Sequence, residues 1–126
     1  MDTWVDLVMT VVRSDTDIPT LRTWAGLTGK SVGSLRLHCY AIHLPPRRTL
    51  VFARLLRAVS QSSGQRWDLG EWLRAADPRT LTDIARLGGI PESAPCTPSV
   101  SLYLARQCLL PADSRAMHAI RIAIDT

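Results

Sequence analysis

The stretch TLRTWAGLTGKSVGSLRLHCY, residues 20–40, decides how the whole sequence is interpreted. Two segments with helical apolar spacing flank Gly29, which suits the end of one helix and the turn to the next. A helix-turn-helix needs a small residue where its helices cross, a glycine four residues later, and an apolar anchor in the second helix. Ala25, Gly29 and Leu35 have this spacing. We therefore predict a helix-turn-helix over residues 20–42, against the alternative of a helical hairpin with basic decoration.

The second segment of the stretch, Val32–Tyr40, is predicted to be the helix that enters the major groove of DNA. Ser31 can cap its first turn, and the hydroxyl and the helix N-terminus can also hold a phosphate. Arg36 is the long donor at its centre and suits a bidentate contact to guanine, whereas Val32 suits a thymine methyl group. Leu37 is expected either in the groove or against a neighbouring helix. The side chains expected to face outward are Val32, Gly33, Arg36, Leu37 and Tyr40.

The charge distribution favours a polyanionic partner. The chain has 126 residues and a formal net charge of +4, and between Asp17 and Asp68 it contains eight basic residues and no acidic one. Solvated faces usually mix both signs, so a long acid-free block is typical of a nucleic-acid binder. The expected phosphate contacts are Arg22, Lys30, Arg47, Arg48 and Arg54, with Tyr40 as a further candidate.

The apolar periodicity of the rest of the chain predicts an all-α fold, a compact bundle of six to eight helices. Apolar residues make up 46 % of the sequence, which is enough for a core without a metal or a disulfide. Beyond the motif, helices are expected at residues 3–13, 45–60, 69–75, 78–87, 100–109 and 113–124.

The domain boundary is expected near residue 90. Residues 1–90 form the predicted DNA-binding domain, with a linker helix at 45–60, and residues 91–126 hold a Pro-rich linker and a helical pair for packing or dimerisation. An internal echo, T-L-x-x-[W/I]-A-x-L-x-G, joins residues 19–29 and 79–89. Prolines follow the second copy where a recognition helix would run, so a single DNA-recognition helix is expected.

Other kinds of site have weaker signals. Cys39 and His43 are spaced for one helix face and are possible zinc ligands, but no second close ligand pair exists, which favours a buried Cys39. Trp67, beside Arg66, is the candidate for stacking on single-stranded bases. We expect no enzyme, metal or cofactor. The odd cysteine count, the absence of a signal-peptide pattern and the lack of a long apolar run lead us to expect a soluble cytoplasmic protein without a membrane partner.

Residues 21–59, LRTWAGLTGKSVGSLRLHCYAIHLPPRRTLVFARLLRAV, resemble the DNA-binding region of AraC-type transcriptional regulators. That region has the pattern A-x-x-x-G-x-S-x-x-x-L, a connector ending in proline, and a linker helix rich in Leu and Arg. The matching residues here are Ala25, Gly29, Ser31, Leu35, Pro45 or Pro46, Leu50, Arg54 and Leu55. The chain is most similar to short bacterial AraC-like proteins, through an early Trp4 and the segment DPRTL at residues 77–81. His43 stands where the family has glycine.

This resemblance implies a bacterial, sequence-specific DNA-binding regulator that acts on double-stranded DNA. The base contacts that it implies are Ser31, Val32, Gly33, Arg36 and Tyr40. No effector-binding β-barrel precedes the motif, so no small-molecule effector is implied. Because the chain is expected to have a single helix-turn-helix, we expect a homodimer through the C-terminal helices or the N-terminal helix. The alternative function is a helical adaptor or subunit whose basic face binds an acidic partner or RNA.

Overall fold

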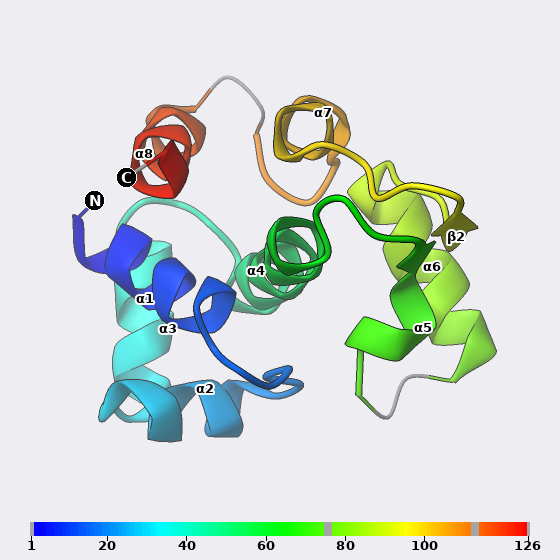
Figure 1. Ribbon diagram of the computed structural model, residues 1–126. Coiled ribbons are helices and arrows are strands. Elements are labelled where there is room, and N and C mark those ends of the chain that lie inside the picture. Colours follow the sequence, from blue (N-terminus) through cyan, green and yellow to red (C-terminus); the bar gives the residue numbers. More distant parts are fainter. Residues whose placement is uncertain (1, 75–76, 112–113, 126) are drawn as a thin grey trace.

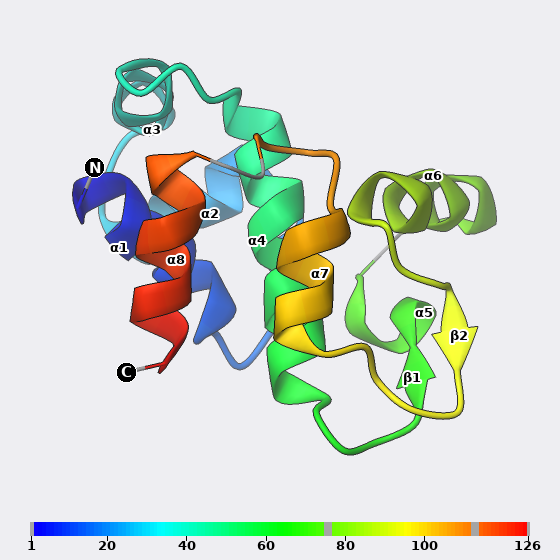
Figure 2. The same cartoon turned by 90° about the horizontal axis from the view of Figure 1, so that it is seen from above.

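The long helix α4 (Pro46–Gln61) runs through the middle of the molecule in the computed structural model (Figures 1 and 2). Proline at its first position has the fixed φ that suits a helix start, where its missing N–H costs nothing. Phe52, Ala53, Leu55 and Leu56 are completely buried, although they lie on different sides of the helix. A helix with buried residues on different sides needs neighbours on each of those sides. Helices α1, α2, α3, α6 and α7 pack around α4.

The structure describes residues 2–74, 77–111 and 114–125. Within these ranges, eight helices and two very short strands follow one another along the chain. The other elements are α1 (Asp2–Val12), α2 (Leu21–Thr28), α3 (Val32–Tyr40), β1 (Trp67–Asp68), α5 (Leu69–Trp72), α6 (Pro78–Gly88), β2 (Ser93–Ala94), α7 (Val100–Arg106) and α8 (Arg115–Asp125). The prediction of an all-α bundle of six to eight helices is confirmed.

The helices occur where the periodicity predicts them, and their ends differ by a few residues. Helix α3 spans Val32–Tyr40, the range predicted for the second helix of the motif. Helix α7 ends at Arg106 because Gln107 adopts an extended backbone conformation. Helix α5 covers four residues and is shorter than predicted. The predicted ends at Ala75 and Asp113 lie outside the described residues.

The two C-terminal helices share the core of the N-terminal part. Helix α8 packs against α1, and α7 packs against α4. Tyr103 of α7 is fully buried; its hydroxyl donates to the Phe52 carbonyl oxygen at 2.9 Å, and the two rings stack with centroids 5.7 Å apart. Met117 and Ile120 of α8 are also fully buried in the same cluster. The chain after residue 90 thus contributes side chains to one continuous core.

The short antiparallel pair β1–β2 is a feature that the sequence did not predict. Trp67 lies opposite Ala94, and Asp68 lies opposite Ser93. The second strand falls in the segment predicted to be a Pro-rich linker. Two-residue strands carry no periodic pattern, because alternation needs several residues to be visible. The pairing fixes the loop after α6 next to the start of α5, away from α2 and α3 (Figure 2).

Candidate nucleic-acid interface

Local hydrogen bonds define the turn between α2 and α3. Gly29 ends α2 with φ at 71°, a left-handed conformation that glycine adopts without strain. The backbone N–H of Lys30 then donates to the Ala25 carbonyl oxygen at 3.1 Å. Ser31 caps α3, because its hydroxyl oxygen accepts from the backbone N–H of Ser34 at 3.0 Å. The predicted roles of Gly29 and Ser31 in the turn are confirmed.

Buried side chains fix this helix pair against the rest of the core. Ala25 is buried, and Leu35 and Cys39 of α3 are completely buried. The indole of Trp24 is also fully buried, and its Nε1–H donates to the backbone oxygen of Leu7 in α1 at 3.0 Å. Helix α3 therefore has one side committed to the core, and its rotation about its own axis is set by packing.

The opposite side of α3 faces solvent. Residues three and four apart on a helix form one surface stripe, and the stripe here is formed by Gly33, Arg36, Leu37 and Tyr40, all exposed. Ser31 is exposed at the start of the helix, whereas Val32 is half-buried and packs against the core cluster. Four of the five residues predicted to contact bases are thus exposed, and Val32 is only partly accessible.

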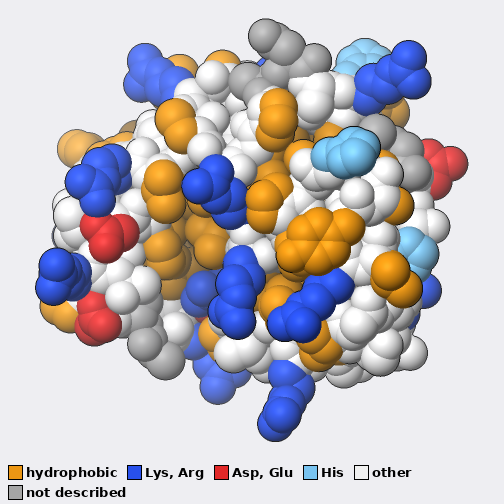
Figure 3. All heavy atoms as spheres, turned by 180° about the vertical axis from the view of Figure 1, so that it is seen from behind, with side chains coloured by type: hydrophobic (Ala, Val, Ile, Leu, Met, Phe, Trp, Pro, Cys, Tyr) orange, Lys and Arg blue, Asp and Glu red, His pale blue; other side chains and the backbone are white. Residues whose placement is uncertain are grey.

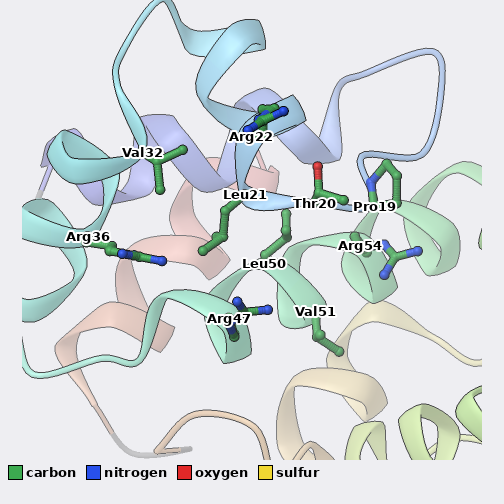
Figure 4. Close-up of a pocket in the computed structure, with 10 residues that line it drawn as sticks. All are labelled: Pro19, Thr20, Leu21, Arg22, Val32, Arg36, Arg47, Leu50, Val51 and Arg54. Carbon is green, nitrogen blue, oxygen red and sulfur yellow. The ribbon is translucent and has the colours of Figure 1, made fainter.

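A hollow of about 400 Å³ opens beside this stripe, between α2, α3 and the start of α4. Figure 4 shows Arg36 and Arg47 extending into the same space from α3 and α4, beside the apolar side chains of Leu21 and Leu50. A second hollow of about 320 Å³ shares Leu21, Arg36 and Arg47 with the first and is also lined by Tyr40, Pro45 and Pro46. The lining of the first hollow is Pro19, Thr20, Leu21, Arg22, Val32, Arg36, Arg47, Leu50, Val51 and Arg54.

The surroundings of these hollows are basic. Figure 3 shows the face that carries α3: Lys and Arg side chains surround an apolar centre, and acidic side chains lie mostly near the left and right margins. The sequence explains this, because α2, α3 and α4 all lie in the acid-free block. Guanidinium groups around a concave surface whose lining includes no carboxylate suit a phosphate backbone.

Most of the predicted phosphate contacts are accessible. Arg22, Arg47 and Arg48 are exposed, and Lys30 is half-buried at the turn. Arg54 is the exception, and its prediction as a phosphate contact is wrong. It is only 8 % exposed, and its Nε and Nη2 donate to the two carboxylate oxygens of Asp17 at 2.8 and 2.6 Å. A guanidinium already paired in this bidentate manner has its binding edge occupied.

Arg57, one turn further along α4, is also internal. Its Nε and Nη2 donate to the backbone oxygens of Ser14 and Asp15 at 2.9 and 2.8 Å, and its guanidinium lies over the Trp72 ring. Burial lowers the pKa of Arg57, and the charges of Asp17 and Asp15 oppose that shift. Two of the eight basic residues in the acid-free block therefore hold the fold together.

The other candidate sites behave as structural residues. Cys39 is buried, and burial raises the pKa of its thiol, while a hydrogen bond with Thr49 acts in the opposite direction. Across the described ranges, no group of three or more His, Cys, Asp or Glu residues is arranged to hold a metal ion. Trp67 is fully buried and donates from Nε1 to the Pro91 oxygen at 2.7 Å. Trp67 is therefore not exposed for base stacking, and its prediction as the residue that stacks on single-stranded bases is wrong.

Sequence reasoning missed some residues that shape the interface. Asp17 is one, because its partner Arg54 lies 37 residues away. Leu21 and Pro46 are others, since they line the hollows while looking like ordinary helix-start residues in the sequence. The signal for Asp17 was its place at the edge of the acid-free block, next to the start of α2.

Comparison with known proteins gives no relative from which a function is transferred: no protein-family model, curated protein or solved structure matches the chain. Within the described ranges, no helix has both the length and the apolar character needed to cross a membrane.

Proposed function

We propose that this chain is a sequence-specific DNA-binding transcriptional regulator of the AraC type with a single helix-turn-helix. Helix α3 would lie in the major groove, with Arg36 against a guanine. Arg22, Lys30, Arg47 and Arg48 would hold the phosphates on either side. In the proposed complex, phosphate contacts supply most of the affinity and fix the register, while the stripe on α3 supplies the sequence preference.

One observation carries this proposal: the exposed stripe of α3 adjoins a hollow whose rim is formed by Arg22, Arg36 and Arg47. These three residues come from three different helices, so folding brings them together. Gly33, in the same stripe, has open space around it, with only the Ser31 hydroxyl 3.8 Å from an added Cβ. A small residue there allows the backbone of α3 to approach base edges closely.

The backbone at the end of α3 also supports the AraC-type resemblance. His43 has φ at 60°, the left-handed conformation that favours glycine. It occupies the position where the AraC-type pattern has glycine. The conformational requirement of the pattern is thus present here although the residue differs. His43 lies in the connection between α3 and α4, and the conformation of this connection determines where Arg47 lies relative to α3.

A homodimer is part of the proposal, because one helix-turn-helix usually gains specificity by binding two half-sites. A groove of about 310 Å³ between α1 and α8 offers an apolar contact surface, lined by Val5, Ala119, Ile122 and Ala123 with Asp2 and Asp6 at its edge. Ile122 is 57 % exposed. Sedimentation at micromolar concentration checks this part, and a monomer together with Ile122→Glu at unchanged operator affinity would exclude it.

Fluorescence anisotropy with random-sequence duplex DNA, between about 50 and 300 mM salt, tests the proposal. Four to five phosphate contacts predict a slope of log affinity against log salt of about −4. Arg47→Ala is expected to reduce the magnitude of that slope by about 0.9. Arg79→Ala, an exposed arginine at the start of α6, is the matched control and is expected to change nothing.

Arg36→Ala separates DNA reading from the alternative of a protein or RNA adaptor. A DNA reader loses its preference for a selected site in this variant and keeps most of its affinity for random duplex. If the preference survives in Arg36→Ala, or if the wild-type protein binds no duplex at the lowest salt, the proposal is wrong. Binding of an acidic protein or of RNA that depends on Arg47 would then identify the basic face as an adaptor surface.

A further inference from the structure

Leu37 is the most exposed large apolar side chain among the described residues. It is 73 % exposed, and Tyr40, one turn further along α3, is 60 % exposed. The same helix buries Leu35 and Cys39 completely, so α3 has enough apolar surface for the core without Leu37. Packing within the chain leaves this leucine uncovered. Leu37 and Tyr40 belong to the same exposed stripe as Arg36, so a partner that covers this stripe would also cover both side chains.

The charge around Leu37 determines what kind of partner can cover it. Arg36 is its neighbour in the chain, Arg47 lies across the hollow from Arg36, and no acidic residue occurs between Asp17 and Asp68. The partner must therefore be strongly anionic and still present an apolar group at the centre of the contact. The major groove has this combination, because the C5-methyl group of thymine lies between two rows of phosphates.

In the proposed complex, the geometry of the helix would direct Leu37 and Arg36 at neighbouring bases. Adjacent residues differ by about 1.5 Å along the helix axis and by about 100° around it. Both side chains nevertheless belong to the exposed stripe that runs from Gly33 to Tyr40. When Arg36 contacts a guanine, Leu37 is directed at an adjoining base pair. Leu37 has no hydrogen-bonding group, so it can discriminate there by apolar contact.

We propose that Leu37 recognises the methyl group of a thymine next to the guanine that Arg36 contacts. This inference rests on the proposed function and makes it more specific: Leu37 is a specificity-determining residue, and the preferred site contains a thymine that is read by its methyl group. Val32, which the sequence suggested for such a contact, is half-buried and packs against the core, so it is less accessible than Leu37.

Replacing thymine by deoxyuridine tests the inference, because uracil keeps the base pair and removes only the methyl group. A duplex carrying the site selected by the wild-type protein is synthesised with each thymine replaced in turn. One replacement is expected to weaken wild-type binding about four-fold, the factor that burial of one methyl group gives. Leu37→Ala is expected to bind the thymine duplex about four-fold more weakly and to bind both duplexes equally. Leu102→Ala, an exposed leucine of α7, is the matched control and should behave as wild type.

The outcomes separate this inference from the proposed function. If the site is bound in an Arg36-dependent manner but no thymine is sensitive to the replacement, the role of Leu37 is wrong and the proposed function stands. The same conclusion follows if the sensitivity persists in Leu37→Ala. If Leu37→Ala leaves all duplex affinities unchanged, Leu37 makes no contact with the DNA and the inference is wrong. Absence of duplex binding by the wild-type protein overturns both.

Discussion

Replacing Asp17 by alanine is expected to destabilise the protein by about 3–5 kcal/mol, the usual cost of removing one partner from a buried ion pair. Asp17 is 3 % exposed, and its carboxylate accepts three hydrogen bonds. Two come from Arg54 at 2.8 and 2.6 Å, and one comes from the backbone N–H of Arg74 at 2.8 Å. Without the carboxylate, a buried guanidinium and a backbone donor lose their acceptor together.

Urea denaturation followed by tryptophan fluorescence measures this loss. For a small domain the free energy of unfolding falls by about 1–3 kcal/mol per molar urea, so the midpoint should shift by more than about 1 M. The control is Asp83→Ala. The Arg86–Asp83 ion pair has the same N–O separation of 2.6 Å, but its side chains are 75 % and 54 % exposed. Exposed pairs contribute about 0–1 kcal/mol, so its midpoint should hardly move.

The two variants together test whether burial, rather than distance, decides the strength of these pairs. Equal losses in Asp17→Ala and Asp83→Ala would refute the reasoning. The double variant Asp17→Leu with Arg54→Met adds a second check, because an apolar pair removes the uncompensated charge. It is expected to be more stable than Asp17→Ala, and still below wild type by about 1 kcal/mol for the lost Arg74 hydrogen bond. A double variant less stable than Asp17→Ala would contradict the account.

Two further predictions concern the helix ends and alkaline pH, and urea denaturation measures both. Gly29→Ala is expected to cost about 1 kcal/mol through its φ of 71° alone, since an added Cβ has nothing within 4 Å. Gly89→Ala should cost more, because its φ is 65° and an added Cβ would lie 2.6 Å from the Arg106 oxygen; equal costs would contradict this. Burial raises the pKa of Tyr103 well above its ordinary value of 10.0, so its contribution to stability is complete below pH 10 and is lost as pH rises toward the folded-state pKa. Tyr103→Phe removes the hydrogen bond to the Phe52 carbonyl oxygen, so its free energy of unfolding is expected to be about 1 kcal/mol lower than that of wild type at neutral pH. Between pH 9 and 11, the free energy of unfolding of this variant should fall less than that of wild type.

The parts of the fold that follow from nearby residues could be predicted from the sequence. Gly29 and Ser31 end and begin helices through bonds to residues three or four positions away. Asp77 caps α6 in the same way, with its carboxylate accepting from the Thr80 N–H at 2.8 Å. Such information is local, because a cap needs only one turn of chain. For the same reason, the exposed and buried sides of α3 could be derived from its spacing once Leu35 was taken as the anchor.

The features that depend on distant contacts could not be predicted. The β1–β2 pair joins residues 27 and 25 positions apart, Trp67 with Ala94 and Asp68 with Ser93, and nothing in either dipeptide specifies a partner. The burial of α4 on all sides depends on α7, which lies some 40 residues further along the chain. From the sequence, Arg54 and Arg57 are expected on the solvent-exposed side of an amphipathic helix. Their burial becomes visible only when the loop after α1 and the region around Trp72 are placed over them.

Arg47 and Arg54 show why a block of positive charge identifies a partner only after the chain is folded. Both lie on α4, two turns apart, and both belong to the acid-free block. Arg47 extends into the hollow beside α3, whereas Arg54 is paired with Asp17, the acidic residue that forms the boundary of that block. Asp17 lies at the end of the acid-free block in the sequence, yet the loop before α2 places its carboxylate against Arg54 of α4. The pairing has a consequence for binding: it removes one cation from the proposed interface and fixes the start of α2, which carries Arg22, against α4. In the proposed complex, the Asp17–Arg54 pair would help to position Arg22 opposite Arg47 across the hollow, because it joins the loop before α2 to α4.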